Sequence, residues 1–242
     1  MSDVQINSLS FQRYLAWQNP LARWLIWLQF QCDRLYWRCL IAGAEGAKRA
    51  FDITVSFLAL VILGPLLAFI ALLIKWEDGG QVLFTQTRVG RFGREFKMYK
   101  FRSMCLNAEE RLAALLARNQ HTEGVTFKIA DDPRITKIGK WLRKFSFDEL
   151  PQLYNVLIGD MSLVGPRPPV PREVALYSLA DRRRLLIKPG ITCFWQISGR
   201  SEIDFSGQVL LDVKYIETHS FWVDIKILAK TVPAVLSAKG AC

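Results

Sequence analysis

The sequence lacks the patterns that build disulfide-stapled or zinc-binding proteins. Its five cysteines are an odd number, and no two of them form a Cys-x-x-Cys pair. Only two histidines occur, His121 and His219, and they stand far apart, so we interpret both as surface residues rather than ligands. These absences argue against a disulfide framework and a zinc site, and they fit a reducing cytoplasm.

Signals that would divide or export the chain are also missing. The N-terminus is polar and carries no signal-peptide pattern. There is no internal repeat, low-complexity tract or long linker. For 242 residues we therefore expect one main domain with appended elements.

Basic and apolar residues, by contrast, are abundant. The formal net charge is +10, 51% of the residues are hydrophobic, and eight are Trp. Such a charge suits nucleic acid, an anionic membrane surface or phosphorylated ligands. A soluble nucleic-acid binder is rarely this apolar, and no nucleic-acid-binding module is recognisable. We therefore expect anionic membrane lipids as partners and no nucleic acid, because Trp and Lys/Arg together favour the membrane interface.

Residues 1–47 form an N-terminal arm with a helical pattern. Asn19-Pro20 reads as an N-cap followed by Pro in the first turn, and the helix is expected to continue to about Ile41, before Gly43. Three arginines and a glutamine fall on one narrow arc of that helix: Arg23, Gln31, Arg34 and Arg38. They make it a poor spanning helix. An amphipathic interfacial helix and a helix packed on protein both stay open.

Residues 48–75 contain the longest apolar run. Ile53 to Ile74 carries no charge and is long enough to cross a bilayer. Gly64-Pro65 lies at its centre, where Pro removes a backbone donor and kinks a helix. Lys or Arg flanks both ends, which draws both ends to the cytoplasmic side. The pattern predicts a re-entrant helix–break–helix hairpin, with a kinked transmembrane helix as the alternative.

Residues 76–242 read as the catalytic body. Gln81 to Met104 predicts two strands joined by a Gly-containing turn, whose Lys97, Lys100 and Arg102 form either a solvated face or a phosphate-binding one. The acidic pair before Pro133, Asp131 and Asp132, predicts a turn or cap rather than a metal site. Arg134 to Lys144 is expected to form a basic helix.

The stretch Phe145 to Pro168 places the acidic pair Asp148-Glu149 at the start of a short helix that ends at Gly159. Pro151 favours a helix start at Asp148, which would then be a plain N-cap, and spacing alone favours this interpretation. A helix N-terminus also attracts phosphate. A carboxylate there can attack phosphorus if a metal and arginines offset the repulsion between anions.

Motifs along this body resemble one family. They are Lys140-Trp141-Leu142-Arg143, Asp148-Glu149-Leu150-Pro151-Gln152, Gly159-Asp160-Met161-Ser162-Leu163-Val164-Gly165-Pro166-Arg167-Pro168, Lys188-Pro189-Gly190-Ile191-Thr192 and Gln196-Ile197-Ser198-Gly199-Arg200. With the Lys48-Arg49-x-x-Asp52 lead-in and the kinked apolar run, the chain from about residue 48 is similar to bacterial sugar transferases, the monotopic polyprenyl-phosphate phosphoglycosyltransferases.

The resemblance implies a mostly helical α+β protein with a re-entrant hairpin bent at Gly64 and Pro65, a small β-hairpin and interfacial helices, on the cytoplasmic face of the bacterial inner membrane. It implies transfer of a sugar-1-phosphate from a UDP-sugar to undecaprenyl phosphate, with release of UMP. By position Asp148 would be the nucleophile and Glu149 the Mg²⁺ ligand. The arginines matching those that handle the phosphates and nucleotide are Arg143, Arg167 and Arg200.

Departures from the family pattern limit what carries over. The bend is Gly64-Pro65 where members often have Ser-Pro, so one backbone-satisfying hydroxyl is lost. Cys193-Phe194-Trp195 resembles the variant in transferases that start exopolysaccharide or O-antigen repeats with a hexose-1-phosphate. Larger relatives have transmembrane helices and a further domain before the catalytic part, and here only the arm of residues 1–47 stands there.

We therefore expect an N-terminal arm (1–47), a membrane hairpin (48–75) and a catalytic domain (76–242). The leading hypothesis is a membrane phosphoglycosyltransferase that begins exopolysaccharide, capsule or O-antigen assembly. The competing hypotheses are a non-catalytic membrane-surface adaptor, whose acidic pair only caps a helix, and a basic nucleic-acid binder. The sugar, the pathway and a homo-oligomeric state stay open.

Overall fold

The computed structural model describes residues 19–108, 110, 132–199 and 203–236. The chain divides into two compact units, Met1–Ala50 and Phe51–Cys242. Asp131 and Arg200, both singled out in the sequence, lie outside the described residues.

Within the first unit the described residues belong to helix α2 (Pro20–Asp78), which continues into the second unit. Its start is as predicted, because the Asn19 side chain accepts a hydrogen bond from the Leu21 N–H at 3.0 Å. The expected end near Ile41 is wrong, since the helix runs on through Gly43 and Gly46. Glycine weakens a helix by only about 1 kcal/mol per residue, which neighbouring helix-forming residues offset here.

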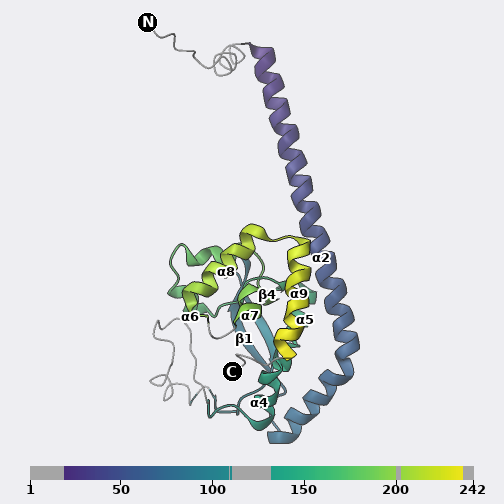
Figure 1. Cartoon of the computed structure of the whole chain (residues 1–242), viewed down its shortest axis with the longest axis vertical. Coiled ribbons are helices and arrows are strands. Elements are labelled where there is room, and N and C mark those ends of the chain that lie inside the picture. The colour runs from purple at the N-terminus through teal and green to yellow at the C-terminus, as the bar shows by residue number, and fades with distance from the viewer. Residues whose placement is uncertain (1–18, 109, 111–131, 200–202, 237–242) are drawn as a thin grey trace. The chain divides into compact units, whose positions relative to one another are not determined.

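The apolar run lies in the part of α2 that belongs to the second unit. By length and composition α2 is able to cross a membrane, and only 11% of its most apolar window is buried. The expected interruption at Gly64-Pro65 is not a break: the helix is continuous through Pro65. Its blue C-terminal part instead changes direction (Figure 1), as expected for a helix that contains Pro.

The remaining elements of the second unit are short. They are β1 (Leu83–Val89), η1 (Arg91–Gly93), β2 (Glu95–Phe101), α4 (Lys137–Lys144), η3 (Phe147–Glu149), α5 (Gln152–Ile158), β3 (Ser162–Val164), α6 (Pro171–Ala175), η4 (Asp181–Leu186), β4 (Gly190–Thr192), α7 (Phe194–Ser198), α8 (Phe205–Thr218) and α9 (Phe221–Leu236). The mostly helical α+β composition is as predicted. The predicted hairpin is confirmed as β1 and β2, which pair antiparallel from Leu83↔Phe101 to Val89↔Glu95.

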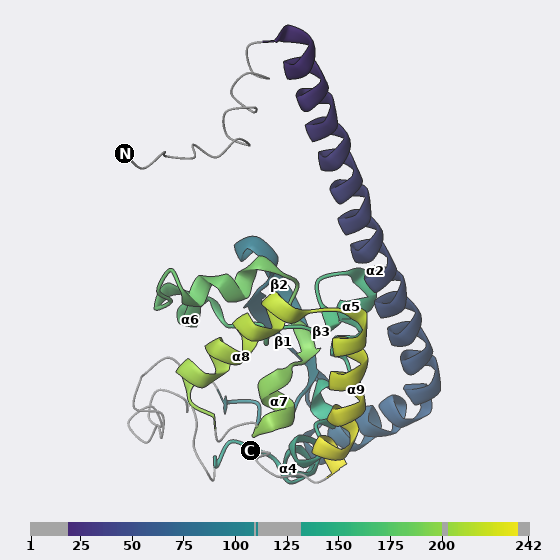
Figure 2. The same ribbon diagram turned by 45° about the horizontal axis from the view of Figure 1, so that its top comes forward.

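The main core lies between the α2 segment from Phe51, α5, β3, α8 and α9. Its buried members include Val156, Leu163, Tyr215 and Ile227, and α9 runs beside α2 in both ribbon views (Figures 1 and 2), where Phe51 and Phe221 stack edge to face. A second cluster of Ile70, Ile74, Phe101 and Leu142 joins the end of α2 to β2 and α4. The elements that carry the acidic pair and its basic neighbours are thus packed directly on α2.

A buried carboxylate fixes α2 to the centre of this unit. Asp52 is 3% exposed, and its Oδ1 accepts a hydrogen bond from the Leu163 N–H in β3 at 3.2 Å. The last residue of the Lys48-Arg49-x-x-Asp52 motif therefore has a structural role. It fixes the position of β3, the strand that leads into the Gly-Pro-Arg-Pro turn.

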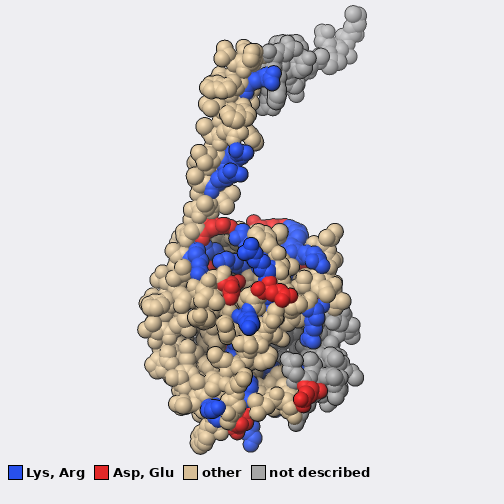
Figure 3. All heavy atoms as spheres, turned by 180° about the vertical axis from the view of Figure 1, so that it is seen from behind, with Lys and Arg blue, Asp and Glu red and all other residues tan. Residues whose placement is uncertain are grey.

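Apolar side chains remain on the surface of the α2 segment from Phe51. Exposed examples are Phe57, Leu58, Val61, Ile62, Phe69 and Leu72. On the face seen in Figure 3, a broad area carries no charged side chain, and Lys and Arg gather toward its upper end with Asp and Glu among them. An exposed apolar surface of this extent is compatible with membrane association.

Strands β3 and β4 join two of the sequence motifs. They pair in parallel, with Ser162 opposite Gly190 and Val164 opposite Thr192. The pairing continues beyond the strands, because Gly165 N–H donates to Thr192 O at 3.0 Å and Gly190 N–H donates to Pro166 O at 2.9 Å. A Cβ atom on Gly190 would lie 2.1 Å from the Gly165 nitrogen, so only glycine permits this approach.

Replacing Gly190 with Ala should therefore destabilise the second unit by about 2 kcal/mol or more, since the backbone of one motif must move. Denaturant unfolding of the detergent-purified protein measures this. Gly46→Ala is the matched control, because nothing lies within 4 Å of its added Cβ, and it should be neutral or slightly stabilising. Equal stability of Gly190→Ala and the wild type would contradict the close packing.

Candidate active site

A cavity of about 870 Å³ lies beside the β-hairpin. It is lined by β1, β2, the α4–η3 connection, the Gly-Pro-Arg-Pro turn, α7 and the start of α8. Four of the residues singled out in the sequence line it: Arg143, Asp148, Glu149 and Arg167. The structure thus gathers side chains separated by up to 24 positions into one site.

The acidic pair lies on a single 3₁₀ turn and does not cap a helix. Ser146 before it has φ 55°, in the left-handed region, and no side chain caps either η3 or α5. The predicted role of Asp148 as an N-cap is therefore wrong. An N-cap residue needs extended backbone, whereas Asp148 lies inside the 3₁₀ turn and α5 begins only at Gln152, after Pro151.

The Asp148 carboxylate lies at the cavity with little solvent around it. Its residue is 8% exposed, and it lies within η3 at the wall of the cavity. Burial raises the pKa of Asp148, and the neighbouring Glu149 adds to the rise, while the charges of Lys100 and Arg143 oppose it. A carboxylate that is partly desolvated and does not serve as a helix cap is a better nucleophile than a capped one.

Glu149 has the opposite environment. Lys100 Nζ donates to its Oε1 at 2.7 Å, and Arg167 Nη1 lies 3.7 Å from the same oxygen. Burial acts to raise the pKa of Glu149, but Lys100 and Arg167 outweigh it and hold that pKa at about 2. Glu149 is therefore ionised across the physiological range.

Lys100 is the site residue whose role the sequence left open. It lies in β2 next to the buried Phe101. Burial lowers the pKa of Lys100, and the charge of Glu149 acts against that fall. The alternating pattern of the strand does not distinguish Lys100 from a solvent-exposed lysine. Its ion-pair partner, Glu149, is 49 residues further along the chain.

The arginines are held by backbone and hydroxyl groups. Arg143 Nε donates to Ser103 Oγ at 2.9 Å, and burial lowers the pKa of Arg143 against the charge of Asp148. Arg167 lies over the Trp195 ring, 6.0 Å from its centroid. Arg88, which the sequence did not single out, donates to Pro168 O at 2.8 Å and so supports the turn that carries Arg167.

The predicted bend positions Gly64 and Pro65 lie away from the cavity, whereas Asp132 lines it. Gly64 and Pro65 are in α2 and are not among the residues lining it. Asp132 accepts the Arg134 N–H at 3.0 Å and pairs with the Arg134 guanidinium at 2.6 Å, both side chains being buried. The predicted turn at Asp132 is therefore confirmed.

The donor set at the acidic pair fits Mg²⁺ only in part. Among the residues that the structure describes, no three His, Cys, Asp or Glu gather in a metal site. Mg²⁺, however, is commonly held by one or two carboxylates together with substrate phosphates and water. Both cations approach Oε1 of Glu149, so Oε2 of Glu149 would be the protein ligand.

Comparison with known proteins identifies relatives of this chain. The family model described as "Bacterial sugar transferase" matches residues 43–238. "Galactosyl transferase CpsE" of Streptococcus agalactiae is 55% identical over 81% of this chain and 43% of its own length. "Undecaprenyl-phosphate galactose phosphotransferase" of Salmonella typhimurium is 45% identical over 80% and 41%.

These two relatives are long proteins, and the matched region spans less than half of each. "Exopolysaccharide production protein ExoY" of Sinorhizobium fredii is 41% identical over 81% of this chain, and that match covers 88% of its own length. The match to the family model and the coverage of ExoY agree with the motifs and with the expectation of a transferase. This chain belongs to the bacterial sugar transferase family.

Proposed function

We propose that the protein transfers a sugar-1-phosphate from a UDP-sugar to undecaprenyl phosphate, and that the group transferred is a hexose-1-phosphate. The observation that carries this proposal is the environment of Asp148: a buried carboxylate at the cavity, close to the charges of Lys100, Arg143 and Arg167. The name of the Salmonella relative supports undecaprenyl phosphate as the acceptor, and the name of ExoY supports a role in exopolysaccharide production.

The proposed reaction has two displacements at one phosphorus. In the first, an Asp148 oxygen attacks the phosphorus next to the sugar, the bond to the bridging oxygen breaks, and UMP leaves with that oxygen. In the second, an oxygen of undecaprenyl phosphate attacks the same phosphorus and the Asp148 carboxylate is released. Both steps need positioning and neutralised charge more than covalent chemistry from the protein.

The cations around the acidic pair supply that neutralisation. Arg143, which precedes the acidic pair in the chain, and Arg167, which follows it, both line the cavity. A guanidinium binds phosphate through two parallel hydrogen bonds, which the ammonium group of Lys cannot reproduce. When bound at Glu149, Mg²⁺ would neutralise charge on the diphosphate. Arg200 is proposed, from its place in the family motif alone, to assist with the nucleotide.

Membrane attachment is part of the same proposal. The acceptor phosphate lies at the membrane surface and the UDP-sugar comes from the cytosol, so the site must lie at their boundary. We propose that the apolar run of α2 enters and leaves on the cytoplasmic face of the bacterial inner membrane. The bend in α2 and the basic residues at both flanks of the run support this topology (Figure 1).

The adaptor hypothesis loses its main support. It needs the acidic pair to serve as a helix cap, and neither η3 nor α5 has a side-chain cap. The cost of burying Asp148 without a cap bond is better explained by a chemical role, since buried carboxylates with perturbed pKa gather at functional sites.

Replacing Asp148 with Asn should lower turnover by roughly 10³-fold or more, because the amide keeps the shape and loses the nucleophilic oxygen. UMP release from a UDP-hexose, with undecaprenyl phosphate and Mg²⁺, measures this, and mass spectrometry should find a phosphosugar adduct on the wild type only. Glu217→Gln, an exposed carboxylate paired with Arg183, is the control. Normal turnover of Asp148→Asn would show that the nucleophile is another group.

The acid limb of the pH profile should respond to Lys100. Asp148 must be ionised to attack, so kcat/KM should fall as the pH drops through its raised pKa. The Lys100 charge lowers the pKa of Asp148, and Lys100→Met should therefore move the acid limb to higher pH. Lys97→Met, an exposed lysine in the same strand, should leave the limb unmoved. If kcat/KM fell at the same pH in Lys100→Met and in the wild type, Lys100 would not control the pKa of Asp148.

Cysteine labelling tests the topology. In a background with the native cysteines replaced by Ser, Ala50→Cys and Trp76→Cys lie before and after the apolar run, and both positions are exposed. A membrane-impermeant maleimide added to intact spheroplasts should label neither, and should label both after lysis. Labelling of one of the two sites in intact spheroplasts would establish a transmembrane crossing instead.

A further inference from the structure

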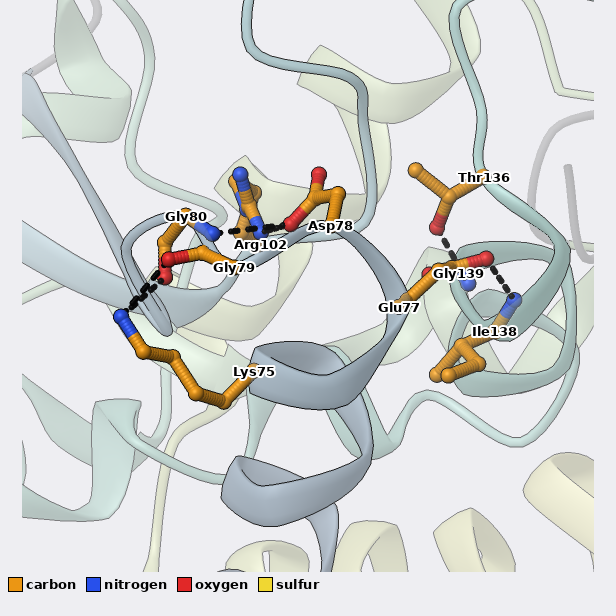
Figure 4. A network of polar contacts seen from close by, with 9 residues as sticks. All are labelled: Lys75, Glu77, Asp78, Gly79, Gly80, Arg102, Thr136, Ile138 and Gly139. Atoms are coloured by element: carbon orange, nitrogen blue, oxygen red, sulfur yellow. Dashed lines mark hydrogen bonds and ion pairs between the residues drawn. The ribbon is translucent and has the colours of Figure 1, made fainter.

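The C-terminal end of α2 makes polar contacts with two elements of the active site. Glu77 Oε1 accepts a hydrogen bond from the Ile138 N–H, in the first turn of α4, at 3.2 Å. Asp78 next to it pairs with Arg102, directly after β2, and accepts the Gly80 N–H at 3.1 Å. Figure 4 shows the two carboxylates pointing in different directions from the end of the same helix.

The contact with α4 completes the start of that helix. The first N–H groups of a helix have no partner within it. Thr136 Oγ1 accepts the Gly139 N–H at 2.9 Å, and Glu77 accepts the preceding one. The Glu77 carboxylate also lies at the positive end of the α4 dipole. One of the two side chains that cap α4 therefore comes from 61 residues earlier in the sequence.

The opposite end of α4 carries Arg143, and its side chain is fixed by the same group of elements. Arg143 Nε donates to Ser103 Oγ, and Ser103 follows Arg102 directly. Helix α4 presses on Ser103 so closely that a Cβ on Gly139 would lie 2.0 Å from the Ser103 carbonyl oxygen. The position of α4, the position of Ser103 and the direction of Arg143 thus depend on one another.

We propose that Glu77 is a positioning residue of the transferase: it fixes α4 on the end of α2 and thereby aims Arg143 at the phosphates of the donor. The inference rests on the proposed function, because it assigns Glu77 an effect on donor use. It also connects the apolar run of α2, through its last turn, to an arginine of the site. Glu77 itself does not line the cavity, so it acts only through α4.

The test is Glu77→Met, which keeps the length of the side chain and removes the acceptor. Glu77 is exposed, so the variant should fold. The first half-reaction, UMP release from UDP-sugar in a single turnover without acceptor lipid, should show kcat/KM lowered about fivefold, as for the loss of one helix cap. Glu77→Gln keeps an acceptor oxygen and should restore most of the rate. Glu217→Met, the exposed surface carboxylate, should match the wild type.

A double-mutant cycle separates positioning from general stability. If Glu77 works through Arg143, Glu77→Met should cause no further loss in an Arg143→Met background. The same double-mutant cycle can be measured without turnover, by determining the UMP affinity of each variant by calorimetry. Equal loss in both backgrounds, or a normal rate for Glu77→Met, would overturn the inference. A wild type that releases no UMP from any UDP-sugar would instead overturn the proposed function, and the UMP-binding cycle would still decide the role of Glu77.

Discussion

Two neighbouring carboxylates in one buried site repel each other, and the arrangement of the charged residues around them follows from how that repulsion is met. Lys100 and Arg167 both approach the same oxygen of Glu149, so one charge of the pair is neutralised almost completely. Asp148 receives only longer-range help from Lys100 and Arg143. The pair is thereby divided into a fixed anion and a carboxylate whose ionised form is costly and therefore reactive.

The cations that meet this requirement come from separate elements, and each is held by groups outside the site. Lys100 is placed by the β-hairpin, Arg143 by the Ser103 hydroxyl, and Arg167 by a turn that Arg88 and the β3–β4 pairing support. Rigid support of this kind matters because charges that are fixed before a charged ligand arrives need no rearrangement to stabilise it. The α2 segment from Phe51 supports the same unit through Asp52 and through the contacts of Glu77 and Asp78.

The parts of this site that were predictable from the sequence are those written in contiguous motifs. The acidic pair, the end of its helix at Gly159 and the turn carrying Arg167 were found because each is a local pattern. The cap role of Asp148 was wrong because Ser146 adopts a left-handed backbone that no residue preference announces. The role of Lys100 stayed open and Arg88 was not singled out, because their partners, Glu149 and Pro168, are 49 and 80 positions away. The predicted end of the helix near Ile41 was wrong because two glycines are only a weak signal for the end of a helix.

The meeting of Gly165 and Gly190 has a consequence for how such sequences diverge. Each glycine occupies space that a side chain on the other would need, and in both cases the obstacle is backbone rather than a side chain that could shrink. A substitution at one position therefore has no compensating substitution at the other, and the two sites should show no covariation in an alignment of descendants. Methods that detect contacts from correlated change will therefore miss this contact, because neither glycine can be replaced.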